Sequence, residues 1–184
     1  MPVDATRHQL EVISAFTRSL MPGGQRAWLF GGWGLDARLG RVTRDHGDIE
    51  FWVHSGQAEQ TQALIAVTGA VRLDTQPAEE SAEYDWAGTR FSTAYFDARP
   101  DGSFASRGRF SDWVFPAGSF PDEPVELAGR PVLAMSVAGM LAMKEQYPRL
   151  RHGHPWRDKD LADMEVLRWM LDPTPPSRSS GQNN

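Results

Sequence analysis

Residues 31–53 read GGWGLDARLGRVTRDHGDIEFWV, and this stretch decides the fold. It opens with a glycine pair, Gly31 and Gly32, directly after the short apolar run Ala27 to Phe30. An apolar run of that length, bounded by glycines, predicts a buried strand. The residues from Trp33 to Leu39 have helical character. The first half of the stretch therefore predicts a strand, a glycine turn and a helix.

The second half predicts another strand, from Asp48 to His54. Its apolar face carries Ile49, Phe51 and Val53, whereas Asp48 and Glu50 share the opposite face with Trp52. Carboxylates two residues apart on a strand can hold a hard cation such as Mg2+ through their oxygens. Glycines at a helix start let a phosphate group approach the backbone N–H groups closely. Together these features predict a site for a magnesium-bound nucleotide.

Outside this stretch the pattern is mixed. Helical periodicity predicts helices at 4–20, 58–68, 136–147 and 158–171. Alternation predicts strands at 70–74, 83–86 and 90–97, with a turn at 85–88. The fold class is therefore α+β, a small mixed sheet flanked by helices. We expect a core at residues 1–130, a helical C-terminal part of the same compact unit at 131–172, and a disordered tail at 173–184.

Composition narrows the function. A chain of 184 residues fits one ordinary domain, and its net charge of -5 argues against a broad basic face for nucleic acid. Without cysteine, disulfides, thiolate metal ligands and thiol catalysis are excluded. No apolar run approaches the roughly 18 residues that a membrane span needs. We expect a cytoplasmic protein, monomer or homodimer, that acts on a small molecule.

The glycine pair with Trp33, followed by residues 44–50 (RDHGDIE), resembles the signature of aminoglycoside and lincosamide nucleotidyltransferases. Residues 36–44 (DARLGRVTR) are especially similar to the aminoglycoside 2''-adenylyltransferases. The resemblance implies a nucleotidyltransferase-type small mixed sheet with an added helical C-terminal part. It also implies the transfer of a nucleoside monophosphate to a hydroxyl group of a small acceptor molecule. The expected donor is ATP, which would supply AMP, or another nucleoside triphosphate. Aminoglycosides and lincosamides are the acceptors it suggests.

The resemblance also assigns roles to single residues. Lys144 and residues 157–163 (RDKDLAD) resemble a Lys and Arg-x-Lys-Asp-x-x-Asp pattern of related transferases. Asp48 and Glu50 would bind Mg2+ as metal ligands and catalytic groups, and the phosphates would be held by Gly31, Gly32, Arg44 and Lys144. For Arg44, an ion pair with Asp36 is an alternative to nucleotide contact, and the sequence leaves both open.

Two positions depart from the family pattern. The usual Asp-x-Asp is Asp48-x-Glu50, a longer second carboxylate that can still coordinate a metal. A third Asp of the family falls on Ser92 or Thr93, and an unassisted hydroxyl is no base near neutral pH. Asp97 is our candidate for the missing catalytic carboxylate, although a bulge would be needed to point it inward. Glu83 and Asp85 are the alternatives.

The missing acid also motivates other functions. A degenerate relative would keep the fold and bind a ligand, or serve a natural-product pathway, without nucleotide transfer. A third possibility is a different reaction on a natural product, in the cleft where relatives of this family would bind the acceptor. Acidic residues of the variable region would attract a cationic acceptor: Glu79, Glu80, Glu83, Asp122, Glu123 and Glu126.

Overall fold

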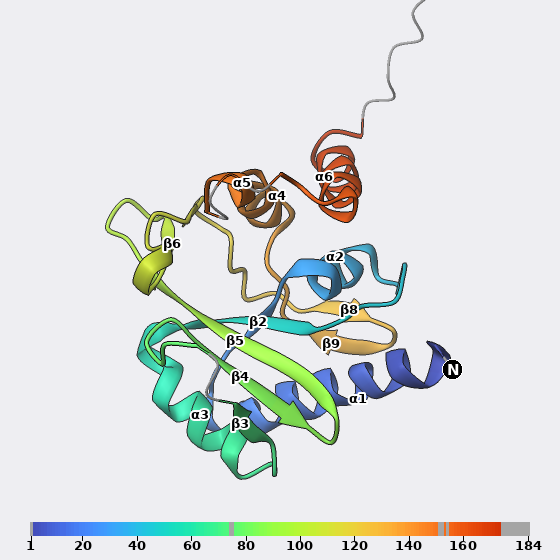
Figure 1. The fold of residues 1–184 in the computed structure, drawn as a ribbon, viewed down its shortest axis with the longest axis vertical. Helices are drawn as coiled ribbons and strands as arrows, with labels where there is room; N and C mark the ends of the chain where they lie inside the picture. Colours follow the sequence, from blue (N-terminus) through green and yellow to red (C-terminus); the bar gives the residue numbers. More distant parts are fainter. Residues whose placement is uncertain (1, 74–75, 151–152, 154, 174–184) are drawn as a thin grey trace, which may run out of the picture.

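The computed structural model describes residues 2–73, 76–150, 153 and 155–173 (Figure 1). Residues 174–184 of the expected tail lie outside the described residues. Asp74, the last residue of the predicted strand 70–74, also lies outside them.

A mixed sheet forms the centre of the molecule (Figure 1). Within the described residues it has seven strands, and its main path runs β1-β2-β5-β4-β3. The strands are β1 (Trp28–Leu29), β2 (Ile49–His54), β3 (Val71–Leu73), β4 (Ser81–Trp86), β5 (Thr89–Ala98), β6 (Phe104–Ser106) and β7 (Val114–Phe115). β2 and β5 are parallel, and their other neighbours pair antiparallel. The predicted mixed sheet is confirmed.

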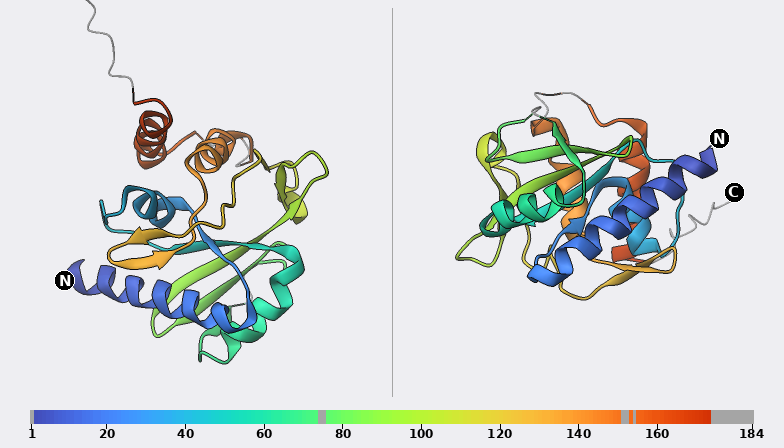
Figure 2. Two further views of the ribbon diagram at one scale, coloured as in Figure 1. Left: turned by 180° about the vertical axis from the view of Figure 1, so that it is seen from behind. Right: turned by 90° about the horizontal axis from the view of Figure 1, so that it is seen from below.

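Helices cover both faces of this sheet (Figures 1 and 2). α1 (Pro2–Leu20) and α3 (Ala58–Ala66) lie on one side, and the remaining helices lie on the other. Those are α2 (Gly31–Leu39), α4 (Val137–Glu145), α5 (Tyr147–Leu150) and α6 (Asp158–Leu171). A separate hairpin of β8 (Val125–Leu127) and β9 (Arg130–Val132) packs beside α2. Three short 3-10 helices complete the order: Met21–Gly23, Ser55–Gln57 and Gly108–Phe110.

The alternation of β2 separates two apolar cores. Ile49, Phe51 and Val53 are buried toward α1, where the ring of Phe16 lies 4.4 Å from that of Phe51. Trp52 is buried in the second core with residues of α4 and α6. Because Glu50 shares the side of Trp52, the carboxylate lies between the sheet and the C-terminal helices.

The structure corrects several predicted boundaries. α2 begins at Gly31, two residues earlier than predicted, because Gly31 adopts a positive φ of 62° that turns the chain from extended Phe30 into the helix. The single helix predicted at 136–147 is divided into α4 and α5. The pairs β6–β7 and β8–β9 were not predicted, since strands of two or three residues are too short to show alternation.

None of the helices among the described residues combines the length and the apolar character that crossing a bilayer requires.

Two hairpin turns carry alanine in a left-handed conformation. Ala87 (φ 53°) and Gly88 (φ 84°) join β4 to β5 at the predicted turn, and Ala128 (φ 48°) and Gly129 (φ 77°) join β8 to β9. Two-residue turns with positive φ at both positions favour Asn-Gly, because Asn tolerates this region better than Ala.

We predict that Ala87→Asn and Ala128→Asn each raise the free energy of unfolding by about 0.5–1 kcal/mol, because each relieves part of the left-handed strain. Ala87→Val should lower it, since a β-branched residue fits positive φ poorly. Urea unfolding measures all three changes. Asn variants that unfold at lower urea than the parent would contradict this account.

Candidate active site

The glycine turn brings the start of α2 against two side chains. A Cβ on Gly31 would collide with the carboxylate of Glu50, and a Cβ on Gly32 would collide with the ring of His46. Both positions therefore favour glycine for packing, and Gly31 favours it also for its positive φ of 62°. The first N–H groups of a helix have no intrahelical acceptor, so the start of α2 presents donors and positive helix-dipole charge beside these glycines.

Asp48 and Glu50 lie next to this helix start. Asp48 is exposed directly before β2, whereas Glu50 is half-buried within the strand. Burial, and after it the neighbouring charge of Asp48, raises the pKa of Glu50 to about 7. Such a pair of repelling carboxylates is suited to a bound cation, which would neutralise both.

Lys144 lies in a buried cluster of charges. Its side chain is 3% exposed, and Nζ lies 2.9 Å from Asp163 Oδ2 and 3.3 Å from Asp160 Oδ1. Arg157 Nε donates to Asp160 Oδ2 at 2.7 Å. Burial alone would raise the pKa of Asp160, but hydrogen bonds from Arg157 and the charge of Lys144 outweigh burial and lower it to about 2. Lys144 thus lines the site while two carboxylates hold it.

A second network holds Arg44. Asp36 is buried, and its Oδ2 lies 2.6 Å from His46 Nε2 and accepts from the backbone N–H of Thr43 at 3.1 Å. Arg44 instead donates to both oxygens of Asp163, at 3.1 and 3.0 Å. The alternative pairing of Arg44 with Asp36 is therefore wrong, since His46 and Thr43 are the partners of Asp36. These contacts fix the loop that carries Arg44 beside the glycine turn.

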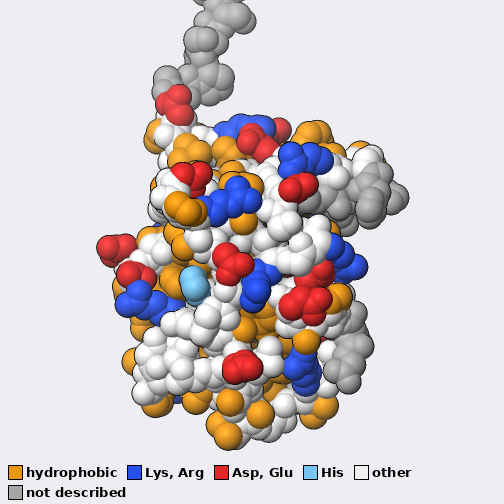
Figure 3. Space-filling view, turned by 90° about the vertical axis from the view of Figure 1, so that its left-hand side faces the viewer, with side chains coloured by type: hydrophobic (Ala, Val, Ile, Leu, Met, Phe, Trp, Pro, Cys, Tyr) orange, Lys and Arg blue, Asp and Glu red, His pale blue; other side chains and the backbone are white. Residues whose placement is uncertain are grey.

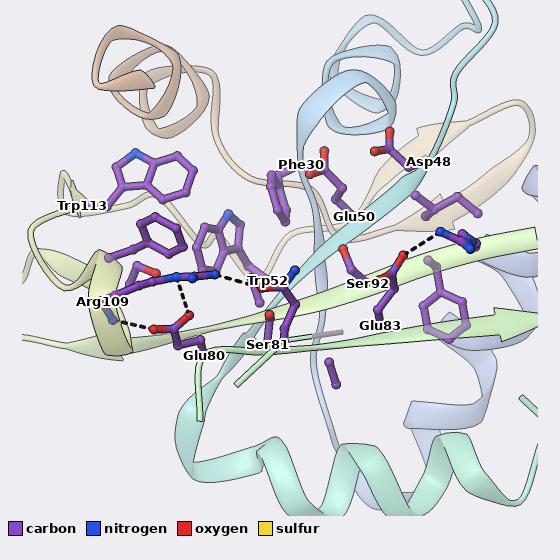
Figure 4. Close-up of a pocket in the computed structure, with 18 of the residues that line it drawn as sticks. Phe30, Asp48, Glu50, Trp52, Glu80, Ser81, Glu83, Ser92, Arg109 and Trp113 are labelled. Carbon is purple, nitrogen blue, oxygen red and sulfur yellow. Dashed lines mark hydrogen bonds and ion pairs between the residues drawn. The ribbon is translucent and has the colours of Figure 1, made fainter. Parts of the chain in front are cut away.

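Two cavities meet at the carboxylates. A small polar cavity of about 80 Å3 is lined by Gly31, Gly32, Arg44, His46, Gly47, Asp48, Glu50, Lys144, Tyr147, Arg157, Lys159, Asp160 and Asp163. A larger cavity of about 400 Å3 is shown in Figure 4, and its lining includes the aromatic residues Phe30, Trp52, Phe91, Phe110, Trp113 and Tyr147. Asp48, Glu50 and Tyr147 line both. A group bound in either cavity would therefore contact the same carboxylates.

Besides Asp48 and Glu50, the larger cavity is lined by two acids that are paired with arginines. Glu80 Oε2 lies 3.0 Å from Arg109 Nε, and Glu83 Oε1 lies 3.6 Å from Arg90 Nη1 (Figure 4). Of the six acids expected to attract a cationic acceptor, these two alone line this cavity. On the face shown in Figure 3, acidic and basic side chains are interspersed. Among the described residues, four acids and two arginines line this cavity, so it combines aromatic surface with an excess of acidic side chains, although only two of the six expected acids contribute to it.

Within this aromatic surface, the indole N–H of Trp52 is buried and has no hydrogen-bond partner among the described residues. A buried donor without a partner costs free energy, and an acceptor atom of a bound molecule would relieve that cost.

Asp97 lies away from both cavities. Its carboxylate accepts a hydrogen bond from Ser55 and pairs with Arg107 at 3.2 Å. Five residues separate Asp97 from Ser92 on β5, which corresponds to about 17 Å along the strand. No bulge in the β2–β5 register turns it toward Glu50, since Ile49 to His54 pair continuously with Phe91 to Phe96. The structure does not bring Asp97 together with Asp48 and Glu50.

Some residues of the site could be predicted from the sequence, and others could not. Gly31, Gly32, Asp48 and Glu50 share a short stretch, and the structure brings them together with Lys144. Tyr147 and Trp113, in contrast, reach the site from α5 and from a loop, and no spacing pattern marks them. Among the described residues, no group of three or more His, Asp or Glu side chains is placed to hold a metal ion.

The raised pKa of Glu50 predicts a pH dependence of stability. The folded protein holds this proton more tightly than the unfolded chain, so the free energy of unfolding falls as pH rises from about 4.5 to about 7. Glu50→Gln removes this loss and should be more stable than the parent at pH 8 by about 1–3 kcal/mol, with little difference near pH 4.5.

Urea unfolding of both proteins across this pH range tests the expectation. Glu59→Gln, at an exposed position of α3, is the matched control and should follow the parent at every pH. A constant offset between Glu50→Gln and the parent would contradict the assigned cause.

Comparison with known proteins gives a family match and several proteins of similar sequence or fold. The model of the aminoglycoside-2''-adenylyltransferase family matches residues 12–167. Proteins from Escherichia coli and Klebsiella pneumoniae described as 2''-aminoglycoside nucleotidyltransferases are 43% identical over 42 residues, which is 23% of this chain. That stretch spans 24% of those relatives, about a quarter of their length.

Solved structures share the fold over most of the chain. A crystal structure of ANT(2'')-Ia in complex with adenylyl-2''-tobramycin has 21% identity and a TM-score of 0.72, over 90% of this chain and 91% of that one. The lincomycin-bound lincosamide antibiotic adenylyltransferase LnuA has 18% identity and a TM-score of 0.60, over 90% of this chain and 95% of that one. Identities this low establish the fold alone. The family model, in contrast, matches most of the chain, residues 12–167. The chain therefore belongs to the aminoglycoside-2''-adenylyltransferase family.

Proposed function

We propose that this protein transfers AMP from ATP, or a related nucleoside monophosphate from its triphosphate, to a hydroxyl group of a small antibiotic-like molecule. The observation that carries the proposal is the position of Asp48 and Glu50, which line both cavities next to the glycine turn. Reactions between two substrates need the reacting groups to meet in one place. A shared pair of carboxylates between two cavities provides that place.

The donor phosphates would bind in the small polar cavity. Its lining combines the start of α2 with the cationic side chains of Arg44, Lys144, Arg157 and Lys159. Arg157 and Lys159 are exposed, whereas Lys144 is held by Asp160 and Asp163. We therefore assign direct phosphate contact to Arg157 and Lys159 as well as to Arg44, and expect Lys144 to act mainly through the positive potential it adds.

Mg2+ fits the carboxylate pair. The two side chains offer oxygen ligands, and a cation beside them would remove the repulsion that contributes to the raised pKa of Glu50. When bound, the metal would neutralise charge on the phosphates. In this proposal Asp48 and Glu50 are its protein ligands, and Gly31 keeps the space that the Glu50 carboxylate occupies.

The acceptor would bind in the larger cavity. There its hydroxyl oxygen forms a bond to the α-phosphorus, the bond to the β-phosphate oxygen breaks, and pyrophosphate leaves with that electron pair. The hydroxyl proton passes to a base. Aromatic rings such as Trp52 and Trp113 offer flat surfaces for a sugar or another ring of the acceptor. Because ATP is made in the cytoplasm, we expect the reaction to take place there.

Pyrophosphate release is the test of this proposal. ATP and GTP with Mg2+ are offered with a panel of aminoglycosides and lincosamides, and nucleotide binding is followed by calorimetry. We predict acceptor-dependent release by the parent protein. Asp48→Asn should lower the rate by roughly 100-fold to 1000-fold, since it removes the charge of one of the two carboxylates proposed to hold Mg2+. Glu59→Gln, on the opposite face of the sheet, is the matched control and should not change the rate.

The outcomes separate the proposal from its alternative. Nucleotide binding that depends on Mg2+, without release in the presence of any acceptor, would favour a ligand-binding relative that has lost transfer. The third family carboxylate falls on Ser92 or Thr93, and the lack of an acid at either position is the observation behind that alternative. Absence of nucleotide binding at millimolar Mg2+ would exclude the transferase.

A further inference from the structure

We propose that Glu83 is the general base that accepts the proton of the acceptor hydroxyl, so that β4 supplies the carboxylate that β5 lacks. The inference rests on the transfer reaction proposed above. It assigns one further catalytic residue to that reaction.

The register of three strands places Glu83 in line with the metal-binding pair. Ser92 of β5 is the direct neighbour of Glu50 on β2, and Glu83 of β4 is the direct neighbour of Ser92 on the other side. Directly paired residues point to the same face of a sheet, so the three side chains form one row. With strands about 4.8 Å apart, the Cα atoms of Glu50 and Glu83 are separated by roughly 10 Å. A reacting hydroxyl can lie between two such side chains.

All three residues of this row line the larger cavity (Figure 4). Glu83 and Ser92 form part of its wall, and Glu50 lies where this cavity meets the polar one. A base must be within hydrogen-bond reach of the proton that it removes. Within the row, the Glu83 carboxylate lies on the side of Glu50 that faces the larger cavity, where the acceptor hydroxyl would release its proton.

Other acids near the row are already engaged in structural contacts. Glu80 accepts from the backbone N–H of Arg109 at 2.6 Å and is 8% exposed in its ion pair with the same residue. Asp85 accepts from the backbone N–H of Gly88 in the β4–β5 turn and does not line the cavity. Neither is placed to take up a proton from a bound acceptor.

The contact of Glu83 with Arg90 is much looser. Its oxygen lies 3.6 Å from Arg90 Nη1, and the Arg90 side chain is 67% exposed. Ion pairs with such an exposed partner contribute little to stability, so the pair with Arg90 is a weak competitor for a substrate hydroxyl. Glu83 itself is 23% exposed, which leaves it accessible from the cavity.

In the resulting step, the Glu83 carboxylate takes the hydroxyl proton while the hydroxyl oxygen attacks the α-phosphorus. Pyrophosphate leaves with the electron pair of the broken bond, and Glu83 later returns its proton to water. No oxidant, reductant or additional reactant is required.

The test removes the carboxylate and then restores one in the same row. Glu83→Gln keeps the size of the side chain and should lower kcat roughly 100-fold to 10,000-fold, the usual contribution of a positioned base. Nucleotide affinity and melting temperature should stay unchanged. Adding Ser92→Asp to Glu83→Gln should recover at least about 10-fold of the loss, because it returns a carboxylate to the neighbouring position. Glu79→Gln, an exposed acid outside the cavity lining, is the matched control.

Each result has a defined meaning. Turnover by Glu83→Gln within about 3-fold of the parent would refute the role of Glu83 while leaving the transfer reaction intact. A loss accompanied by weaker nucleotide binding or lower melting temperature would mean a structural role, and a double variant no faster than Glu83→Gln would also count against a base in this row. If the parent releases no pyrophosphate with any acceptor, the transfer reaction itself fails.

Discussion

The approach of the Gly31–Gly32 backbone to Glu50 and His46 is the contact on which the rest of the site depends. It joins the start of α2 to β2 and to the loop between them, with no room for a Cβ at either glycine. A larger residue at Gly31 would push the Glu50 carboxylate away from the helix start. Both cavities would then lose the wall that they share. The glycines thus set the distance between the donors of a helix end and the carboxylates of a strand.

The buried charges around Lys144 extend this contact to the C-terminal helices. Lys144 on α4 pairs with Asp160 and Asp163 on α6, and Asp163 also accepts from Arg44. Removing one partner of a buried ion pair leaves an uncompensated charge, which typically costs about 3–5 kcal/mol. The helices far along the chain therefore hold the loop next to the glycine turn in place. The charge of Lys144 in this cluster also adds positive potential near the polar cavity.

Local patterns were sufficient to predict those parts of the molecule in which one stretch of chain makes its own structure. The strand–glycine–helix unit, the alternation at 48–54 and the helix at 158–171 are of this kind, and each is present. Contacts between distant segments could not be predicted, because spacing carries no information on them. The sequence leaves open whether Arg44 pairs with Asp36 or contacts the nucleotide, and in the structure His46 is a partner of Asp36 while Arg44 pairs with Asp163. Asp97 was selected for its strand, but register decides which acids face Glu50, and register depends on the turn at Ala87–Gly88.

The two cavities are lined mostly by different segments of the chain. The polar one combines the glycine stretch with α4, α5 and α6, whereas the larger one takes most of its lining from residues 76–113. Apart from Glu83 and Ser92, which lie in the row beside Glu50, residues of this second segment can therefore change without altering the glycine turn or the carboxylate pair. Substitutions at the glycine turn would alter the wall that both cavities share, whereas substitutions at residues 76–113 would alter the lining of the larger cavity alone. Under the proposed function, substitutions in β4, β5 and the loop before Trp113, other than at Glu83, would change which acceptor is bound and leave the phosphate-binding cavity as it is.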